Sequence, residues 1–346
     1  MYRVMAVVAA LCAVPATAQQ RDLPVPADKG WGHAATGVTF PARLAGLPRT
    51  SIRDSTADER DVSLNFETPD RATVVTIFLF HPALANAAIW FDRSEAQIAL
   101  RTDWHGATPA DQNPTAFARP GSAVSAGLKQ AYRTGSKDYP TTALAVVPVG
   151  EWLVAVRYSA RDVDIPALRQ RLNGVIDAIR WPAETGVPPP AARPIAACAD
   201  TLRFGKAKMM KRNINMGLMG GLLSGLMVKP ATDAKPEAPR ELCRDGTPTL
   251  EYGMYRAAGS DGYTIAFGDA GRVAYVAKGI EIPGMNGSGG YTVTFGSVDG
   301  AMATYQSFDR LPSPKQVMDE INSTTPVSRT NLDSEGKTQI HIDAPK

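Results

Sequence analysis

The chain has 346 residues, of which 44% are hydrophobic and 21% are charged, as is typical of globular proteins. Its 37 Lys and Arg residues nearly balance 34 Asp and Glu residues, leaving a net charge of +3. Nucleic-acid binding needs clustered Lys and Arg that displace counterions, so the near-neutral charge argues against a nucleic-acid partner. No apolar stretch of about 18 residues is present, so we expect no transmembrane helix.

Residues 1–18 have the pattern of a cleavable secretory signal. Arg3 precedes an apolar run over residues 4–14, which is too short to cross a bilayer. The small residues of Ala16-Thr17-Ala18 then suit signal peptidase. We therefore expect cleavage between Ala18 and Gln19 and a periplasmic or secreted protein.

The expected export determines how the cysteines are interpreted. Cys12 leaves with the signal, and Leu11 before it is larger than lipoprotein processing requires. The two remaining cysteines, Cys198 and Cys243, form an isolated pair with no histidine nearby in sequence to complete a zinc site. In an oxidising compartment such a pair predicts a disulfide. Its reduction is expected to loosen the second half of the chain and to leave the melting of the first half unchanged.

The first half predicts an α+β domain over residues 31–182, preceded by a flexible leader over residues 19–30. Short strands are predicted at 36–40, 49–55, 61–67, 73–80, 141–149 and 152–159 from β-branched, aromatic and alternating residues. An amphipathic helix is predicted over 88–102. A second helix over 165–180 has Asp164 as its cap, Pro166 in its first turn and apolar residues at three- and four-residue steps. We expect these helices to cover one face of an antiparallel sheet.

A Pro-rich linker over residues 183–197 separates this half from a second predicted domain over residues 198–346. Its proline run favours a stiff, extended chain that cannot enter a sheet interior. In the second domain strands are predicted near 201–204 and at 249–256, 262–267, 272–278, 291–295, 302–307 and 338–343, with a short helix opened by Ser313-Pro314. The predicted fold class is therefore α+β, with two domains that each have a mainly antiparallel sheet and one or two packed helices.

Residues 205–240 form an unusual excursion from the second domain. Basic residues precede an uncharged stretch over 216–228, in which Gly217, Gly221 and Gly225 are spaced by four. On a helix this spacing makes a smooth stripe, but each glycine costs about 1 kcal/mol relative to alanine. One interpretation is a loop that packs on the domain surface. The other is a segment that contacts a lipid surface or a second copy through these glycines and Met216, Leu222 and Leu226.

The sequence predicts no catalytic, cofactor-binding or metal-binding residue. Two short pairs, Asp103 with His105 and His341 with Asp343, bring a carboxylate near an imidazole, but such pairs are common by chance. The sequence around Ser125 partly matches a nucleophile elbow. The alternating strands and helices that this motif requires are not predicted here. The glycines over 284–290 are followed by a predicted strand instead of the helix of a phosphate loop, and residues 58–61 are predicted to be a solvated turn.

Two pieces of the first half resemble known proteins. Gly37-Val38-Thr39-Phe40-Pro41, Gly46-Leu47-Pro48-Arg49 and the strand ending at His81-Pro82 resemble the opening of an uncharacterised family of secreted bacterial proteins. The order of elements over residues 31–182 is similar to PsbP-like α+β domains, which implies a binding or assembly module and no catalysis. No functional residue is implied by this resemblance.

The expected function is that of an exported, non-catalytic binding or assembly module of the bacterial envelope, with an unidentified partner and no cofactor. Two alternatives remain open at this point. One is an exported hydrolase with a site near His105 or His341. The other is a self-associating or peripheral membrane protein that acts through the glycine-rich segment.

Overall fold

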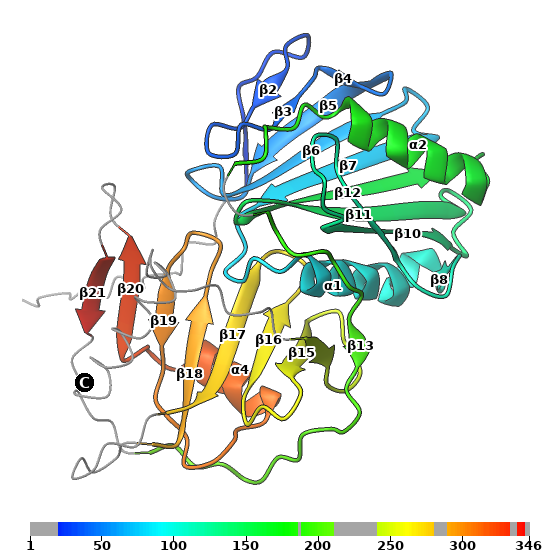
Figure 1. The fold of residues 1–346 in the computed structure, drawn as a ribbon. Helices are drawn as coiled ribbons and strands as arrows, with labels where there is room; N and C mark the ends of the chain where they lie inside the picture. The colour runs from blue at the N-terminus through cyan, green and yellow to red at the C-terminus, as the bar shows by residue number, and fades with distance from the viewer. Residues whose placement is uncertain (1–19, 186–187, 211–240, 280–288, 333–337, 343–346) are drawn as a thin grey trace, which may run out of the picture.

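The computed structural model describes residues 20–185, 188–210, 241–279, 289–332 and 338–342. Within these residues two large sheets lie one above the other, with helix α1 between them (Figure 1). The predicted α+β class with mainly antiparallel sheets is confirmed.

The first sheet has ten strands, and all of its pairs are antiparallel. The strand order is β1-β5-β6-β7-β12-β11-β10-β8, with β4 beside β5 and β9 beside β10. The bounds are β1 (Arg21–Asp22), β4 (Arg43–Leu44), β5 (Leu47–Asp54), β6 (Asp61–Glu67), β7 (Thr73–Phe80), β8 (Thr108–Pro109), β9 (Thr115–Phe117), β10 (Gly127–Arg133), β11 (Thr141–Val149) and β12 (Trp152–Ala160). The expected hairpin of β11 and β12 is confirmed, and a separate small ribbon pairs β2 (Trp31–Gly32) with β3 (Thr39–Phe40).

The second sheet has nine strands, and each pairs with its neighbours in chain order. All of its pairs are antiparallel except β13 with β14, which is parallel. The bounds are β13 (Ala196–Ala197), β14 (Leu242–Arg244), β15 (Tyr252–Ala257), β16 (Tyr263–Phe267), β17 (Arg272–Lys278), β18 (Tyr291–Gly296), β19 (Met302–Thr304), β20 (Ser328–Leu332) and β21 (Thr338–Ile342).

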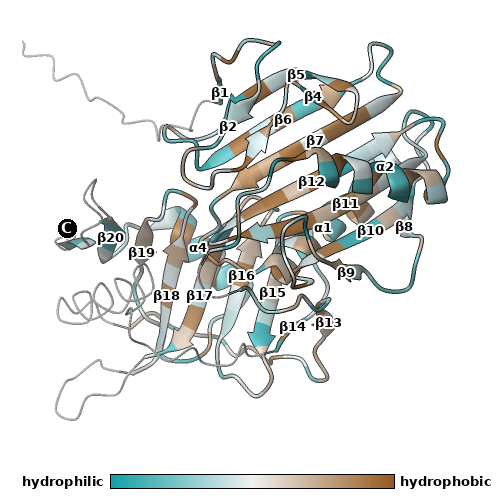
Figure 2. Cartoon of the chain, turned by 45° about the horizontal axis from the view of Figure 1, so that its top comes forward, coloured by the Kyte–Doolittle hydropathy of each residue, from teal (hydrophilic) through white to brown (hydrophobic). Residues whose placement is uncertain are grey.

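Helix α2 (Ile165–Ala178) covers one face of the first sheet, as its sequence pattern predicts. The Asp164 side chain accepts a hydrogen bond from the Ala167 backbone N–H at 2.9 Å and caps the first turn. The apolar side of α2 then packs on the alternate residues of β7, β11 and β12 that face it. In Figure 2 brown hydrophobic segments run along β7 and β12.

Helix α1 (Ala87–Leu100) lies on the opposite face of the first sheet, so the expectation that helices cover only one face is wrong. Asn86 caps the helix by accepting hydrogen bonds from Ala88 and Ile89. Residues 89–94 are buried in an unbroken run. A helix buried on all sides is covered by more than one neighbour, and here the first sheet lies above α1 and β15 and β16 lie below it (Figure 1).

The two sheets share one hydrophobic cluster around α1. Leu144 and Leu153 enter it from the first sheet, Trp90 from the helix, and Tyr255 and Val273 from the second sheet. The outer face of the second sheet packs on α4 (Pro314–Ser323), which is capped by Ser313 as predicted. The second sheet therefore has a core on each face.

Two segments expected to be loose are packed on the sheets. In the predicted leader, β1 pairs with β5 and Leu23 is buried, so residues 21–23 are fixed on the first sheet. Residues 205–210, at the start of the predicted excursion, lie against the second sheet, where Met209 bridges to Phe308 and Ala207 is buried.

The predicted strand near 201–204 is wrong, because these residues are irregular.

The structure describes most of the predicted linker but not the glycine-rich segment. Residues 183–195 run without helix or strand where they are described, and the linker ends in β13 at the edge of the second sheet, where a proline-rich chain is tolerated. Met216, Gly217, Gly221, Leu222, Gly225 and Leu226 lie outside the described residues, as do Ala18 and Gln19. In the described part, no helix has both the length and the apolar character needed to cross a membrane.

Candidate functional site

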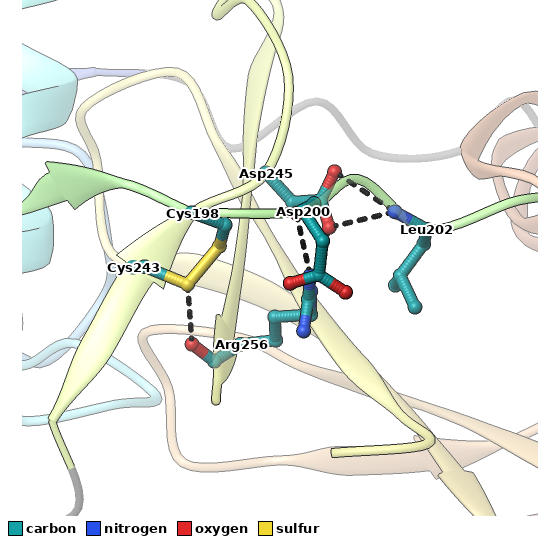
Figure 3. The surroundings of a disulfide bond; sticks show 6 residues. All are labelled: Cys198, Asp200, Leu202, Cys243, Asp245 and Arg256. Atoms are coloured by element: carbon teal, nitrogen blue, oxygen red, sulfur yellow. Dashed lines mark hydrogen bonds and ion pairs between the residues drawn. A yellow bond between two sulfur atoms is a disulfide. The ribbon is translucent and has the colours of Figure 1, made fainter. Parts of the chain in front are cut away.

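The predicted disulfide between Cys198 and Cys243 is present (Figure 3). It joins the end of β13 to β14, with the two Cα atoms 4.9 Å apart. Beside it, the buried Arg256 guanidinium pairs with Asp245 at 2.6 Å and with Asp200 at 3.0 Å. These contacts anchor the chain on both sides of residues 211–240 to the second sheet.

The candidate site is a cavity of about 120 Å³ beneath the first sheet, beside α1. Its lining residues come from the first sheet, from Ser94 of α1 and from the turn between β16 and β17 of the second sheet. Its polar lining consists of Gln20, Ser55, Asp61, Ser63, Ser94, Arg157 and Asp269. Elements from both sheets and α1 therefore build one site.

Asp61 begins β6 and faces this cavity. The side chain is on the face away from α2, because Val62 points into the α2 core and neighbouring residues in a strand alternate. Burial raises the pKa of Asp61 to about 6, and the nearby Asp54 and Asp269 carboxylates add to the rise. Asp61 is therefore a carboxyl whose protonation changes just below neutral pH.

Arg157 supplies the positive charge of the cavity from the middle of β12. Its guanidinium lies 3.8 Å from an Asp269 carboxylate oxygen and 5.7 Å from the centre of the Trp104 ring. The Arg157 side chain is only 15% exposed, and its buried Nε has no hydrogen-bond partner among the described residues. A buried donor without a partner costs about 1–3 kcal/mol, so Arg157 is held here at a cost to stability. Because Nε itself is buried, the side chain lines the cavity through its other atoms.

Asp269 is placed by the tight turn of residues 268–271. The Gly268 carbonyl accepts a hydrogen bond from Arg93 Nε at 2.7 Å, and the Gly271 carbonyl accepts one from the Ala83 N–H at 2.8 Å. Gly271 has φ +84°, and a Cβ there would lie 3.0 Å from Pro82 Cα. The turn therefore depends on glycine to approach the first sheet this closely.

The remaining walls of the cavity are apolar. Phe78, Phe80, Leu144 and Ala155 line it from β7, β11 and β12, and Phe80 stacks edge-on against Trp90 of α1. An apolar wall with a few fixed polar groups is typical of a small-molecule site.

A buried polar network beside the cavity fixes α1 to the second sheet. Asp92 accepts a hydrogen bond from the Tyr255 hydroxyl at 2.6 Å and pairs with Arg244. The fully buried Arg93 also donates to the Thr249 carbonyl at 2.8 Å. Burial raises the pKa of Asp92, while Tyr255 and Arg244 oppose that rise. These contacts hold the two halves of the site in register.

The imidazole pairs considered from sequence lie elsewhere. Asp103 pairs with Arg101 at 2.6 Å, and His105 is exposed in a left-handed conformation. His341 is exposed on β21, and Asp343 lies outside the described residues. His33 and His81 instead flank the Trp152 ring, with ring centres 4.5 and 5.0 Å away.

Other sequence features have structural outcomes. Ser125 is exposed in an irregular segment just before β10, while residues 284–288 lie outside the described part. The expected solvated turn over 58–61 is wrong at its end, because Asp61 enters β6 and is partly buried. In the described residues no group of three or more His, Cys, Asp or Glu side chains is arranged to hold a metal ion.

Sequence reasoning missed Asp61, Arg157 and Asp269 as a group. A signal existed for Arg157, since a lone arginine interrupts the apolar strand Trp-Leu-Val-Ala-Val-Arg-Tyr-Ser-Ala. A charge at such a position needs a partner or a function. Its pairing with Asp269 is not readable from sequence, because 112 residues separate the two.

The chain was also compared with known proteins. No family model matches it, and no curated protein or solved structure matches it significantly.

Proposed function

We propose that the chain is an exported, non-catalytic binding module of the bacterial periplasm, and that its ligand binds in the cavity between the two sheets. The observation that supports this most strongly is the mostly buried Arg157 side chain, which lines the cavity together with Asp61 and Asp269 and has a 3.8 Å contact with Asp269 as its ion pair. Groups of this kind are costly to keep in a core unless they have a use.

The two sheet bodies are proposed to be the two domains expected on either side of the linker, docked through α1. Ligand sites occur preferentially where such bodies meet. Export is supported by the signal pattern over residues 1–18 and by the disulfide, because disulfides persist in oxidising compartments.

The alternative of a hydrolase built on His105 or His341 has less support. Both imidazoles are exposed, and Asp103 is engaged by Arg101 instead of by His105. The alternative of membrane contact or self-association through residues 216–228 stays a prediction, since this segment is outside the described residues.

Native mass spectrometry of the protein purified from a bacterial periplasm tests the proposal. We expect a mature chain that begins at Gln19 and carries a small bound molecule. Arg157→Gln should lose that molecule, while Arg133→Gln, at the exposed end of β10, should retain it. A chain that retains Met1, or a molecule held equally by both variants, would contradict the proposal.

A further inference from the structure

The cavity carries two negative groups and one positive group, all from different elements. Asp61 comes from β6, Asp269 from the turn between β16 and β17, and Arg157 from β12. Arg157 and Asp269 are 3.8 Å apart, which is longer than a good charge-assisted hydrogen bond. Asp61 has a hydrogen bond with Ser55 and lies near the charge of Arg272, but Arg157 and Asp269 are incompletely paired.

This arrangement selects among small charged ligands. A simple anion would pair with Arg157 but would face the carboxylates of Asp61 and Asp269. A simple cation would pair with the carboxylates but would face the positive charge of Arg157, whose own contact with Asp269 is 3.8 Å. A ligand with both charges at short separation pairs with all three side chains.

The size of the cavity limits the ligand further. An engineered cavity of about 150 Å³ holds benzene, so a cavity of about 120 Å³ accepts a molecule of similar or smaller size. The apolar wall formed by Phe78, Phe80 and Leu144 provides room for a short aliphatic group. Ser55, Ser63 and Ser94 supply additional hydrogen-bonding groups around the charges.

We propose that the cavity binds a small zwitterion of the amino-acid class, with its carboxylate on the Arg157 guanidinium and its ammonium between Asp61 and Asp269. This inference rests on the proposed function and names the ligand class of the same site. The carboxylate would give the guanidinium an acceptor at hydrogen-bond distance, which Asp269 at 3.8 Å does not provide.

Three probes with the same number of non-hydrogen atoms test the contribution of each ligand charge to binding. L-alanine has both, L-lactate replaces the ammonium with a hydroxyl, and L-alaninamide replaces the carboxylate with an amide. Calorimetric titration should give a Kd for L-alanine in or below the millimolar range. L-lactate and L-alaninamide should bind at least about tenfold more weakly, because each leaves a buried charge unpaired.

Variants of the cavity residues test which side chain binds each end of the ligand. Arg157→Gln and Asp61→Asn should each weaken L-alanine binding by at least about tenfold. Arg133→Gln and Asp58→Asn, which change exposed residues near the same strands, should bind like the unmodified chain. The variants' urea midpoints establish that each one is folded at the titration temperature.

Each result has a distinct meaning. Equal binding of L-lactate or of L-alaninamide would overturn the zwitterion and indicate an anion site or a cation site. If none of the three probes binds while native mass spectrometry still finds an Arg157-dependent ligand, the zwitterion is overturned and the proposed function stands. If neither experiment finds a ligand, both proposals fail.

Discussion

The Tyr255 hydroxyl of the second sheet donates a hydrogen bond of 2.6 Å to the Asp92 carboxylate of α1, across 163 positions of sequence. Both side chains are buried, and Tyr255 also belongs to the hydrophobic cluster that the two sheets share. This contact links a helix of the first half to a strand of the second half. It therefore couples the two sheets at the border of the candidate site.

The first prediction concerns this contact. Tyr255→Phe keeps the ring and removes the hydroxyl, which leaves a buried carboxylate with one fewer donor. We expect a loss of about 1.5–3 kcal/mol in the free energy of unfolding, measured by urea titration. Tyr252→Phe on the same strand is the control, because Tyr252 packs on the α4 side. Equal losses in the two variants would contradict the role given to the Asp92 contact.

The second prediction concerns the disulfide. From sequence we expected reduction to loosen only the second half, but the shared cluster around α1 changes this expectation. Closing a loop of about 45 residues is worth on the order of 4 kcal/mol in the chain-entropy account. Cys198→Ser with Cys243→Ser should therefore lower the stability of both sheets in one transition.

Tryptophan fluorescence and circular dichroism provide the measurement for this double variant. Tryptophan fluorescence reports on the first sheet and α1, because all five tryptophans lie within residues 31–181, while the far-ultraviolet signal reports on both sheets. Coincident urea curves are expected. A second, separate transition would show that the two halves unfold independently, as the linker first indicated.

The third prediction is a pH dependence that Asp61 causes. Its pKa of about 6 in the folded protein is above the ordinary value near 3.9 of an unfolded chain. Between about pH 4 and pH 6 the folded protein binds a proton that the unfolded chain has lost, so stability falls as the pH rises through this window. Above it, the cost of the buried carboxylate remains in full.

Asp61→Asn should remove this cost. We expect the variant to be more stable than the unmodified chain at pH 7.5, by on the order of 1–3 kcal/mol, and nearly equal to it at pH 4. Urea unfolding at both pH values is the measurement. A gain of the same size at both values would mean that the carboxyl of Asp61 is not the titrating group.

The fourth prediction tests the placement of Asp269. Gly271→Ala adds a Cβ at φ +84°, where it would meet Pro82 Cα at 3.0 Å and Val298 Cγ1 at 2.9 Å. We expect a loss of about 2–4 kcal/mol in unfolding free energy, together with weaker ligand binding in the cavity. Gly246→Ala has a similar φ of +78° but nothing within 4 Å, so it should cost about 1 kcal/mol and leave binding unchanged.

The sequence predicted the parts of the fold that local patterns determine. The helix Ile165–Ala178 has its cap, its first-turn proline and its apolar stripe in consecutive residues, and β7 is a continuous β-branched and aromatic run. Helix α1 was misjudged because residues 89–94 are buried on every side, which a periodicity argument for one apolar face does not detect. The unbroken apolar run over residues 87–91 was the available signal.

The site was not predictable in the same way. Asp61, Arg157 and Asp269 are far apart in sequence and meet only because α1 joins the two sheets. Asp61 resembles its neighbours Asp58 and Glu59 in a charged turn, and only the start of β6 separates it from them. The residue type alone therefore does not predict that Asp61 lines the cavity.

The central claim is that Arg157 binds a ligand in the cavity between the sheets. The most direct measurement is an NMR spectrum of the arginine Nε–H groups, recorded before and after addition of L-alanine and of a small-molecule extract of bacterial periplasm. The Arg157 signal should move on binding, and the signals of exposed Arg133 and Arg169 should stay in place. An unchanged Arg157 signal in both additions, at concentrations where other resonances move, would contradict the claim.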